Sequence, residues 1–417
     1  MPEWDVLVVG AGPVGSTTAY ELARRGHRVL VLEEHARVGY PVQCAGLVSG
    51  RVLDLAGSTA MVRRPVHGAT VYGPSMRSVT FAAPEPRAFV IDRAGLDIAL
   101  ADRASRAGAE YRCGVRFDGL LPDAPGARRA RVTRTDGGPE EIRARLIVGA
   151  DGVASAVARA ARLRRPVEIL PAFEAEIPRV PGDPDRVEVF LGNRIAPGLF
   201  GWSIPDGAGG ARVGVAARAD GTSARQYYER LVEALERRNG APLPAPVALV
   251  VSGIPIGTLP RLSADRVLLV GDAACQVKPL SGGGIFTGMR GGMLAAEVAD
   301  RSLRSDHLDA GALSAYDAAY AAELGAEFRR AHALRRLYTR LSDPEFDRLI
   351  AALAGAKMTE SIVAFGDIDF PSHVASRLLR QSPALLSLFP KAVSAWLFSG
   401  EGVLPELEEG GLRRSAT

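Results

Sequence analysis

The sequence predicts an α/β protein in which a parallel sheet is interrupted by an antiparallel one, with a helical region following both. Three observations lead to this fold class. A buried strand, a glycine-rich turn, a helix and a second buried strand occupy Asp5 to Glu34. Short segments of alternating polarity dominate residues 165 to 257, a pattern typical of an antiparallel sheet that covers a neighbouring layer. Beyond residue 300 the chain is rich in alanine and helical in pattern.

Length and composition describe an ordinary globular protein with more than one domain. The chain has 417 residues, of which 47% are hydrophobic and 24% charged, and its formal net charge is +4. One hydrophobic core rarely serves a chain of this length. No basic, aromatic-interleaved stripe of the kind that binds nucleic acid occurs, so we expect no nucleic-acid partner.

The cysteines and the apolar runs bear on the cellular setting. Cys44, Cys113 and Cys275 are too few for a disulfide framework and lack metal-ligand spacing, so we expect no metal. Free cysteines are typical of a reducing compartment, which predicts a cytoplasmic protein. The chain contains no run of 18 uncharged apolar residues, so we expect no transmembrane helix.

The first strand–helix–strand unit predicts nucleotide binding. GAGPVG places Gly10, Gly12 and Gly15 directly after the first strand, in the G-x-G-x-x-G spacing. Gly10 permits the tight turn, Gly12 lets the backbone approach a pyrophosphate, and Gly15 lets the helix pack closely on the strand. Glu33 ends the second strand, where a carboxylate accepts hydrogen bonds from ribose hydroxyls. We therefore expect a dinucleotide at the N-terminus of this helix.

The next part of the chain alternates between the two predicted layers. Asp92 is a suitable N-cap for a helix that follows. Arg93 lies in the first turn, where a positive charge is unfavourable beside the helix dipole. It is therefore a candidate to pair with a phosphate, and a solvated surface arginine is the alternative. Strands of a second sheet are expected before this helix at Ala69–Tyr72, Ser78–Phe81 and Ala88–Ile91.

Further strands complete both predicted sheets. Arg131–Thr135 and Ile142–Val148 read as two strands, and the second runs into GADGVAS. The antiparallel layer is expected to contain Val187–Leu191, Leu199–Ile204 and Ala211–Ala217, with one helix around residues 224 to 238. The parallel sheet resumes at residues 266 to 270.

The glycine-rich passage after residue 266 distinguishes between cofactors. VGDAA places Asp272 at the end of a strand, where a carboxylate can accept hydrogen bonds from ribityl hydroxyls. The backbone from Ser281 to Ile285 lies along a predicted helix N-terminus, which can stabilise a negatively charged flavin ring. A nicotinamide cofactor has no ribityl chain, so FAD is favoured over NAD. A second G-x-G-x-x-G unit is not found, so no dedicated NAD(P)H domain is evident.

These elements predict three regions. Residues 1–66, 92–160 and 258–302 form a discontinuous FAD-binding, Rossmann-like domain of the glutathione-reductase type. Residues 67–91 and 161–257 form an inserted α+β substrate-binding domain with an antiparallel sheet. Residues 303–417 form a helical C-terminal region.

Five motifs together resemble a known family. GAGPVG with Glu33, GADGVAS and VGDAACQVKPLSGGGIFTGM are similar to the aromatic-hydroxylase superfamily of flavoproteins. PVQCAGLVS resembles the cysteine-bearing loop of archaeal and bacterial geranylgeranyl reductases, and APGLFGWSIP resembles their prenyl-pocket motif, P-x-x-Y-x-W-x-F-P. The resemblance implies FAD-dependent saturation of isoprenoid C=C bonds in a geranylgeranyl lipid or diphosphate. By position it also implies FAD contacts from Gly15, Glu33, Glu34, Ala45, Gly46, Val48, Arg93, Asp272, Gly283, Gly284 and Ile285.

The resemblance also implies that Phe200 and Trp202 contact the prenyl chain. Phe200 replaces the tyrosine of the motif and Ile204 replaces its second aromatic residue, so we expect a pocket for a differently shaped chain. The residues alone agree, because strand alternation places Phe200, Trp202 and Ile204 on one face. We interpret that face as a pocket wall, and an ordinary sheet core is the alternative.

Reduction of an isolated C=C bond requires a hydride from reduced flavin and a proton for the second carbon. No His, Asp or Glu in the Trp202 segment is obviously placed to deliver that proton. Cys44 is therefore the candidate catalytic residue, as a donor or positioning group, and a small buried hydrophobe is the alternative. Cys275, just past Asp272, is a second cysteine expected near the ring. The electron donor stays open among NAD(P)H, ferredoxin and deazaflavin.

Two other functions compete with this one. An FAD-dependent aromatic monooxygenase shares GADGVAS, but its usual polar substrates need hydrogen-bonding groups that are scarce between residues 186 and 217. The other is an electron-transfer flavoprotein module without a substrate of its own. A lipid substrate further predicts peripheral contact with a membrane, through amphipathic Phe328–Leu341 and apolar Pro383–Phe398. Core packing with a solvated face is the alternative for those two segments.

Overall fold

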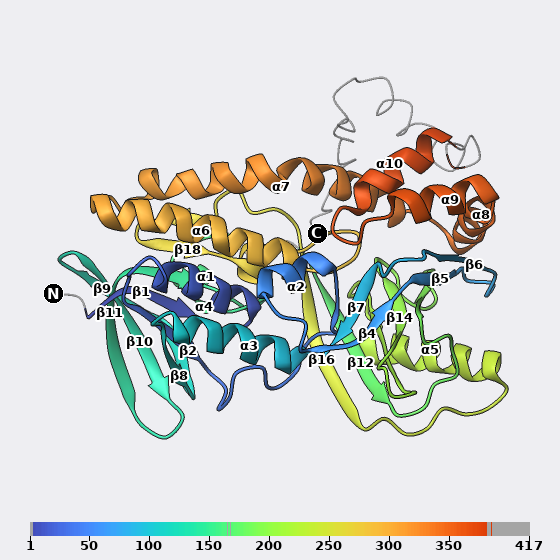
Figure 1. Cartoon of the computed structure of the whole chain (residues 1–417), viewed down its shortest axis with the longest axis horizontal. Helices are drawn as coiled ribbons and strands as arrows, with labels where there is room; N and C mark the ends of the chain where they lie inside the picture. The colour runs from blue at the N-terminus through green and yellow to red at the C-terminus, as the bar shows by residue number, and fades with distance from the viewer. Residues whose placement is uncertain (1–2, 165, 167, 382–384, 386–417) are drawn as a thin grey trace, which may run out of the picture.

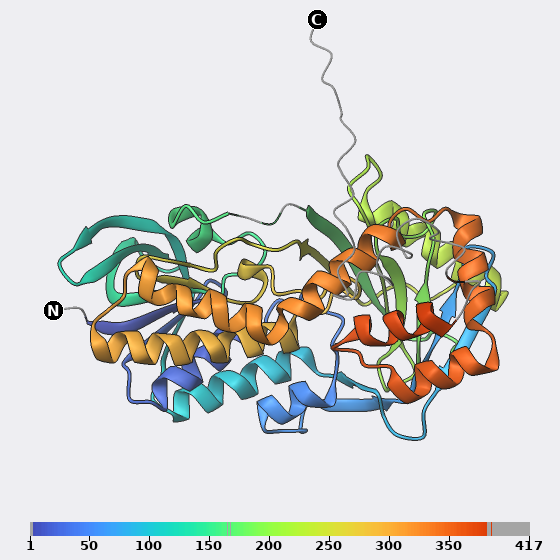
Figure 2. The ribbon, with the colours of Figure 1, turned by 90° about the horizontal axis from the view of Figure 1, so that it is seen from above.

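A largely parallel sheet and a largely antiparallel sheet lie at opposite ends of an elongated molecule (Figure 1). This structure is a computed structural model, and it describes residues 3–164, 166, 168–381 and 385. The long helices α6 (Ile285–Ser305) and α7 (Ala310–Tyr338) lie side by side, and α7 reaches from one half of the molecule to the other (Figure 2).

The first sheet is built on the predicted strand–helix–strand unit. Among the described residues its order is β17-β18-β11-β1-β2-β8, and β8, β2, β1, β11 and β18 run parallel. β10 and β9 extend β11 as antiparallel neighbours; β10 and β11 correspond to the strands expected after residue 130, whereas β9 was not expected. The strands are β1 (Trp4–Val9), β2 (Val29–Glu33), β8 (Glu110–Cys113), β9 (Val115–Ala124), β10 (Ala127–Arg134), β11 (Pro139–Gly149), β17 (Ser263–Ala264) and β18 (Val267–Leu269).

Helices cover this sheet because its strands are apolar on both faces. Val6 to Val9 and Val29 to Leu32 are buried almost completely, as a sheet with two covered faces requires. Helix α1 (Pro13–Ala23) packs between α6 and α3 (Arg93–Arg106). The predicted N-cap of α3 is confirmed, because the Asp92 side chain accepts a hydrogen bond of 3.1 Å from the Gly95 N–H. The short α4 (Ala156–Ala160) follows β11.

The second sheet has the order β16-β12-β15-β14-β13-β5-β6 within the described ranges. Its pairs are antiparallel except β13 with β5, which is parallel. Helix α5 (Ala224–Asn239) covers one face, against β12 and β15. The strands named for this layer are confirmed as β5 (Gly68–Tyr72), β6 (Ser78–Ala82), β13 (Arg186–Phe190), β14 (Phe200–Pro205) and β15 (Ala211–Ala216). The layer also contains β12 (Glu168–Ile177) and β16 (Ala248–Ile256), which we had not named.

One expected strand lies elsewhere. We expected Ala88–Ile91 in the second sheet, but this strand, β7, pairs with β3 (Leu47–Val48) and β4 (Val62–Val66) in a separate small sheet. The Pro-Glu-Pro break at residues 84 to 86 separates β7 from β6, and β7 then leads directly into α3. The small sheet and helix α2 (Gly50–Ala56) therefore lie between the two large sheets (Figure 1).

The C-terminal region is helical, as expected, over its described residues. Helices α8 (Asp343–Leu353) and α9 (Ala356–Phe365) contact β6, and α10 (Pro371–Gln381) contacts α7. The apolar face of Phe328–Leu341 is buried, since Phe328, Ala331 and Leu341 are at most 5% exposed, so core packing holds for this segment. Pro383–Phe398 lies outside the described residues except for Leu385. In the described part of the chain, no helix has the length and hydropathy needed to cross a bilayer.

Candidate active site

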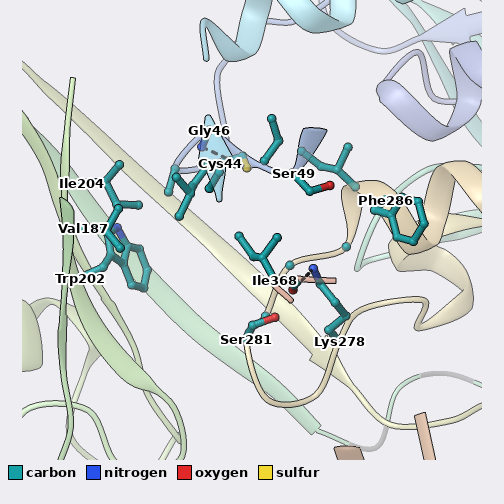
Figure 3. Close-up of a pocket in the computed structure, with 18 of the residues that line it drawn as sticks. Cys44, Gly46, Ser49, Val187, Trp202, Ile204, Lys278, Ser281, Phe286 and Ile368 are labelled. Atoms are coloured by element: carbon teal, nitrogen blue, oxygen red, sulfur yellow. Dashed lines mark hydrogen bonds between the residues drawn. The ribbon is translucent and has the colours of Figure 1, made fainter. Parts of the chain in front are cut away.

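A cavity of about 720 Å³ lies where the three sheets approach one another. The G-x-G-x-x-G turn, the Cys44 loop, the exit of β18 and the N-terminus of α6 all line it. Figure 3 shows Val187, Trp202 and Ile204 across the cavity from Cys44 and Ser49. Lys278, Ser281 and Ile368 line a third side of the cavity. The motifs that the sequence spreads over nearly 300 residues therefore meet at one site, as we expected.

The glycine turn has the geometry that its spacing predicts. Gly10 has a φ of 103°, and a Cβ added there would approach the Ala150 carbonyl oxygen to 2.3 Å. A Cβ on Gly15 would lie 2.0 Å from the Gly10 carbonyl oxygen, so the helix could not pack so closely on the strand. A Cβ on Gly12 would meet nothing within 4 Å, because this glycine borders the cavity. The backbone at Gly12 is thus open to a pyrophosphate.

Most of the predicted site residues line the cavity, but three do not. Glu33 lies behind the turn, where its Oε2 accepts a hydrogen bond of 3.1 Å from Ala11 N–H. Glu34 is exposed, and Gly10 lies within the turn. The predicted residues that line the cavity are Gly12, Gly15, Cys44, Ala45, Gly46, Val48, Arg93, Phe200, Trp202, Asp272, Gly283, Gly284 and Ile285.

Arg93 is a buried cation beside the cavity, which excludes the alternative of a solvated surface arginine. Its side chain is 13% exposed and pairs with Asp97 one turn later. Its Nε has no hydrogen-bond partner among the described residues. Although burial opposes the charge, Asp97 and Cys44 raise the pKa of the guanidinium, so it stays cationic. A buried positive charge with a free donor suits an anionic ligand.

Asp272 and the start of α6 form the other polar side of the cavity. The Asp272 carboxyl lies in a 3-10 turn, η1 (Gly271–Ala274), and burial raises its pKa to about 6 while Arg93 opposes that rise. Gly284 caps α6 without a side-chain hydrogen bond, so the first N–H groups of the helix are open to a ligand. The hydroxyls of Ser49 and Ser281 line the same cavity and have no partner in the described part of the chain.

This donor and acceptor set fits FAD. A dinucleotide with a ribityl chain needs close backbone approach at its pyrophosphate, a carboxylate for its hydroxyls and N–H donors for its ring. Gly12, Asp272 and the α6 N-terminus provide these groups. Ser49 and Ser281 were not predicted, since an isolated serine gives no distinguishing signal in a sequence.

A segment of the C-terminal region closes one side of the cavity. The Lys278 ammonium donates to the Ile368 carbonyl oxygen at 2.8 Å and to Asp369 Oδ1 at 2.9 Å. Arg51 pairs with Asp367 and Asp369 from the other side. Residues 366 to 369 are thereby fastened next to the Ser281–Gly284 loop, where Ile368 borders the cavity (Figure 3).

The two candidate cysteines lie in different settings. Cys44 lines the cavity, and its Sγ accepts a hydrogen bond of 3.4 Å from the Gly46 N–H (Figure 3). Cys275 is buried behind the β18 exit and does not line the cavity. Burial and the nearby Asp272 raise the pKa of the Cys275 thiol to about 12, so this sulfur is an inert thiol. Of the two, only Cys44 is placed to reach a ligand.

The wall opposite Cys44 is apolar. Strand β14 presents Phe200, Trp202 and Ile204 to the cavity, as their alternation predicted. The rings of Phe200 and Trp202 pack edge to face, with 6.3 Å between their centroids. Leu199, Val187 and Ala172 extend this surface. The interpretation as a pocket wall is therefore favoured over an ordinary sheet core.

One carboxyl in this wall was missed. The indole Nε1–H of Trp202 donates to Glu174 Oε2 at 2.7 Å, and Glu174 is only 4% exposed. Burial raises the pKa of Glu174 to about 7, against the Trp202 hydrogen bond and the charge of Arg212. The Trp202 segment itself contains no acid, because Glu174 belongs to β12, two strands away in the sheet. The register that joins the strands is not visible in the sequence.

The fold and the site define an FAD-dependent flavoprotein oxidoreductase. Residues 3–299 match the family model described as an FAD binding domain. Digeranylgeranylglycerophospholipid reductase 2 of Methanothermobacter thermautotrophicus is 33% identical over 91% of this chain and 99% of its own length. The digeranylgeranylglycerophospholipid reductase of Methanocaldococcus jannaschii is 32% identical over 93% of this chain and 97% of its own length. The chain belongs to the geranylgeranyl reductase family of FAD-binding proteins.

A solved structure gives the same result in three dimensions. The geranylgeranyl bacteriochlorophyll reductase-like protein of Thermoplasma acidophilum superimposes with a TM-score of 0.78 and 26% sequence identity. The alignment covers 91% of this chain and 98% of that chain.

Proposed function

We propose that this protein saturates isolated C=C bonds of a geranylgeranyl chain, carried by a prenyl lipid or a prenyl diphosphate, with FAD as its redox cofactor. The supporting observation is that one cavity has dinucleotide-binding groups on one side and an apolar wall on the other. A reactive ring and a hydrocarbon chain can therefore share one cavity. The family and the names of its curated members agree with this activity.

In this proposal the polar side of the cavity binds FAD. Gly12, Gly15 and Arg93 contact the pyrophosphate region, while Asp272 accepts from ribityl hydroxyls. The loop from Ala45 to Val48 and the residues Gly283, Gly284 and Ile285 border the ring. Reduced flavin supplies a hydride to a carbon–carbon double bond. Behind the turn, Glu33 fixes the Ala11 N–H and so the shape of the pyrophosphate site.

The apolar side binds the prenyl chain. Phe200 and Trp202 are its aromatic contacts, and Val187, Leu199 and Ile204 complete the wall. Phe200 and Ile204 are the two departures from the family motif, and both line the cavity. Aliphatic Ile204 in place of an aromatic ring widens the space beside Trp202, which favours a chain of different shape. Exclusion of water by this wall protects the site from side reactions.

The two competing functions fit the cavity less well. A monooxygenase for polar aromatics needs hydrogen-bonding groups around its substrate. On the apolar side Glu188 already accepts from Arg238 and Tyr72, and Glu174 already accepts from Trp202 with one of its two carboxyl oxygens. An electron carrier has no need for an apolar cavity wall beside its flavin.

The electron donor and the route of the lipid are further parts of the proposal. The single G-x-G-x-x-G unit in the sequence supports an external donor, such as NAD(P)H, ferredoxin or deazaflavin. Peripheral contact with a membrane is supported by Val247, Leu249 and Val251, which are 60 to 70% exposed on the edge strand β16 and the residue before it. Their alternate neighbours Val250 and Ser252 line the cavity, so the apolar edge adjoins the binding site.

Anaerobic reduction followed by lipid analysis tests the function. The FAD-loaded protein, reduced with dithionite, is incubated with geranylgeranyl diphosphate or a digeranylgeranyl glycerophospholipid, and the products are analysed by mass spectrometry. The proposal predicts a gain of two hydrogens per saturated bond and reoxidation of the flavin. An unchanged substrate, or NADPH-driven oxygen uptake with a hydroxylated product, would overturn it.

Flotation tests the membrane contact separately. The protein is mixed with vesicles of phosphatidylcholine and phosphatidylglycerol and centrifuged through a density gradient. We expect the wild type to float and a variant with Val247, Leu249 and Val251 all changed to Ser to remain at the bottom. Ile98→Ser removes an exposed apolar residue from α3 and is the control, expected to float. Equal flotation of all three proteins would contradict contact through β16.

A further inference from the structure

Saturation of a double bond requires a proton source as well as a hydride, and this inference rests on the proposed function. Glu174, Trp202 and Gly214 form one row across three strands of the second sheet. Gly214 of β15 lies opposite Glu174 of β12 on one side and opposite Trp202 of β14 on the other. The row faces the cavity, where both Glu174 and Trp202 are lining residues.

Gly214 makes this contact possible. A Cβ at position 214 would lie 2.5 Å from the Trp202 ring, so only glycine lets the indole lie across β15. The ring reaches Glu174 over the intervening strand and donates its N–H at 2.7 Å. The hydrogen bond occupies one carboxyl oxygen, Oε2, and no other hydrogen bond to the carboxyl group of Glu174 is found among the described residues.

The charged groups around Glu174 leave it without a counter-ion. Arg212 of β15 is the nearest cation, but its guanidinium donates to the carbonyl oxygens of Ala45 and Ile91 and pairs with Glu176. Glu176, on the same strand as Glu174, adds a like charge. On the far side, β16 places Val250 opposite Glu174. With no ion pair in the described part of the chain, burial favours the neutral carboxyl and raises its pKa to about 7.

The other ionisable groups that line the cavity each have a partner or another assignment. Lys278 pairs with Asp369 at 2.9 Å, Glu188 pairs with Arg238, and Asp367 pairs with Arg51. His67 Nδ1 lies 3.0 Å from the Pro84 carbonyl oxygen, and Arg87 donates to the Val363 carbonyl oxygen. Asp272 is assigned to FAD, and Cys44 borders the polar side, with Arg93 nearby. Glu174 is the acid that lies within the apolar wall, where the hydrocarbon chain would be bound.

We propose that Glu174 is the general acid of the reduction and donates its proton to the carbon that does not receive the hydride. The π bond of the substrate breaks and two C–H bonds form, one with the hydride of the reduced flavin and one with the Glu174 proton. The O–H bond of Glu174 breaks and leaves a carboxylate, to which Trp202 continues to donate. The flavin becomes oxidised, and a proton from solvent restores the acid before the next turnover.

Glu174→Gln separates this role from a structural one, because the amide keeps the shape and can still accept from Trp202. The control is Glu229→Gln, the same change at an exposed position on α5. Single-turnover reoxidation of the reduced FAD-loaded protein by geranylgeranyl diphosphate is followed without oxygen. We expect a loss of roughly 10² to 10⁴-fold for Glu174→Gln and no change for the control. The wild-type rate should fall as pH rises above about 7, because the acid must be protonated.

A second readout does not depend on turnover. In the FAD-loaded protein labelled with ¹⁵N-tryptophan, the indole N–H resonance of Trp202 should titrate with a midpoint near pH 7 and lose this titration in Glu174→Gln. Trp202→Phe assigns the resonance. If the wild type reduces the substrate and Glu174→Gln does so at the same rate with the same pH profile, Glu174 is not the general acid. If the wild type reduces no substrate while its Trp202 resonance still titrates, the proposed function is wrong instead.

Discussion

Lys278 and Asp369 form a buried ion pair, with 2.9 Å between Nζ and Oδ1, that joins the loop before α6 to the segment before α10. The two side chains are only 6% and 2% exposed. The cavity lies directly beside them, so the pair fixes one of its walls.

Breaking this pair should destabilise the protein strongly. Asp369→Asn leaves a buried ammonium without its carboxylate, and we expect the free energy of unfolding to fall by about 3 to 5 kcal/mol. The measurement is urea unfolding of the FAD-saturated protein. The exposed pair of Arg225 and Glu229 is the control, since Glu229→Gln should cost less than about 1 kcal/mol. Equal effects of the two substitutions would contradict the structural role given to Asp369.

Arg93 should contribute to the affinity for FAD. Arg93→Gln removes a buried positive charge beside the glycine turn, and hydrogen bonds to charged groups are worth about 1.5 to 3 kcal/mol. The dissociation constant of FAD should therefore rise roughly 10- to 100-fold, as measured by calorimetric titration of the apoprotein. Arg225→Gln on the surface of α5 should leave it unchanged. An unchanged constant in Arg93→Gln would show that the cation binds no part of the cofactor.

Gly214→Ala should displace the indole from Glu174. The added methyl group overlaps the Trp202 ring, and such overpacking costs typically 1 to 3 kcal/mol of stability. The ¹⁵N resonance of the Trp202 indole should shift and lose its dependence on pH. Gly138→Ala is the matched control, because its Cβ would meet nothing within 4 Å. If the Trp202 resonance of Gly214→Ala titrates as in the wild type, the indole does not need this glycine.

The pH profile of kcat/KM should respond to Trp202 in a defined direction. The indole hydrogen bond lowers the pKa of Glu174, against the effect of burial. Trp202→Phe removes that hydrogen bond, so the pKa of Glu174 rises above about 7. Because the protonated acid is the active form, the alkaline limb of the profile should move to higher pH, at a lower maximal rate. Trp4→Phe in β1 should leave the limb in place, and a limb that moves to lower pH in Trp202→Phe would contradict the assignment.

The parts of the site that could be predicted from the sequence are those specified by local patterns. The glycine turn and the Asp272 exit each lie within one strand–turn–helix unit, so spacing alone defines their geometry. Arg93 was a candidate because a cation in the first turn of a helix is unfavourable without a partner. The alternation around Trp202 identified the correct face of β14.

The remaining parts depend on contacts between distant segments. Glu174 reaches Trp202 only through the register of three strands, and Asp369 reaches Lys278 only because residues 366 to 369 return to the cavity. Strand β7 was assigned to the wrong sheet for the same reason, since alternation indicates a strand but not its neighbour. The apolar face of Phe328–Leu341 was open to two interpretations, because a buried helix and a membrane-bound helix share one pattern.

Arg212 bridges the halves of the molecule, since this buried residue of β15 donates to the Ala45 carbonyl oxygen at 2.7 Å and to that of Ile91. Movement of the antiparallel sheet away from the cysteine loop would break both hydrogen bonds, and hydrogen bonds to charged groups are worth about 1.5 to 3 kcal/mol each. We therefore expect the chamber to keep its width during turnover. A long hydrocarbon chain would then enter the cavity with one end first, and its successive double bonds would reach the flavin ring in turn.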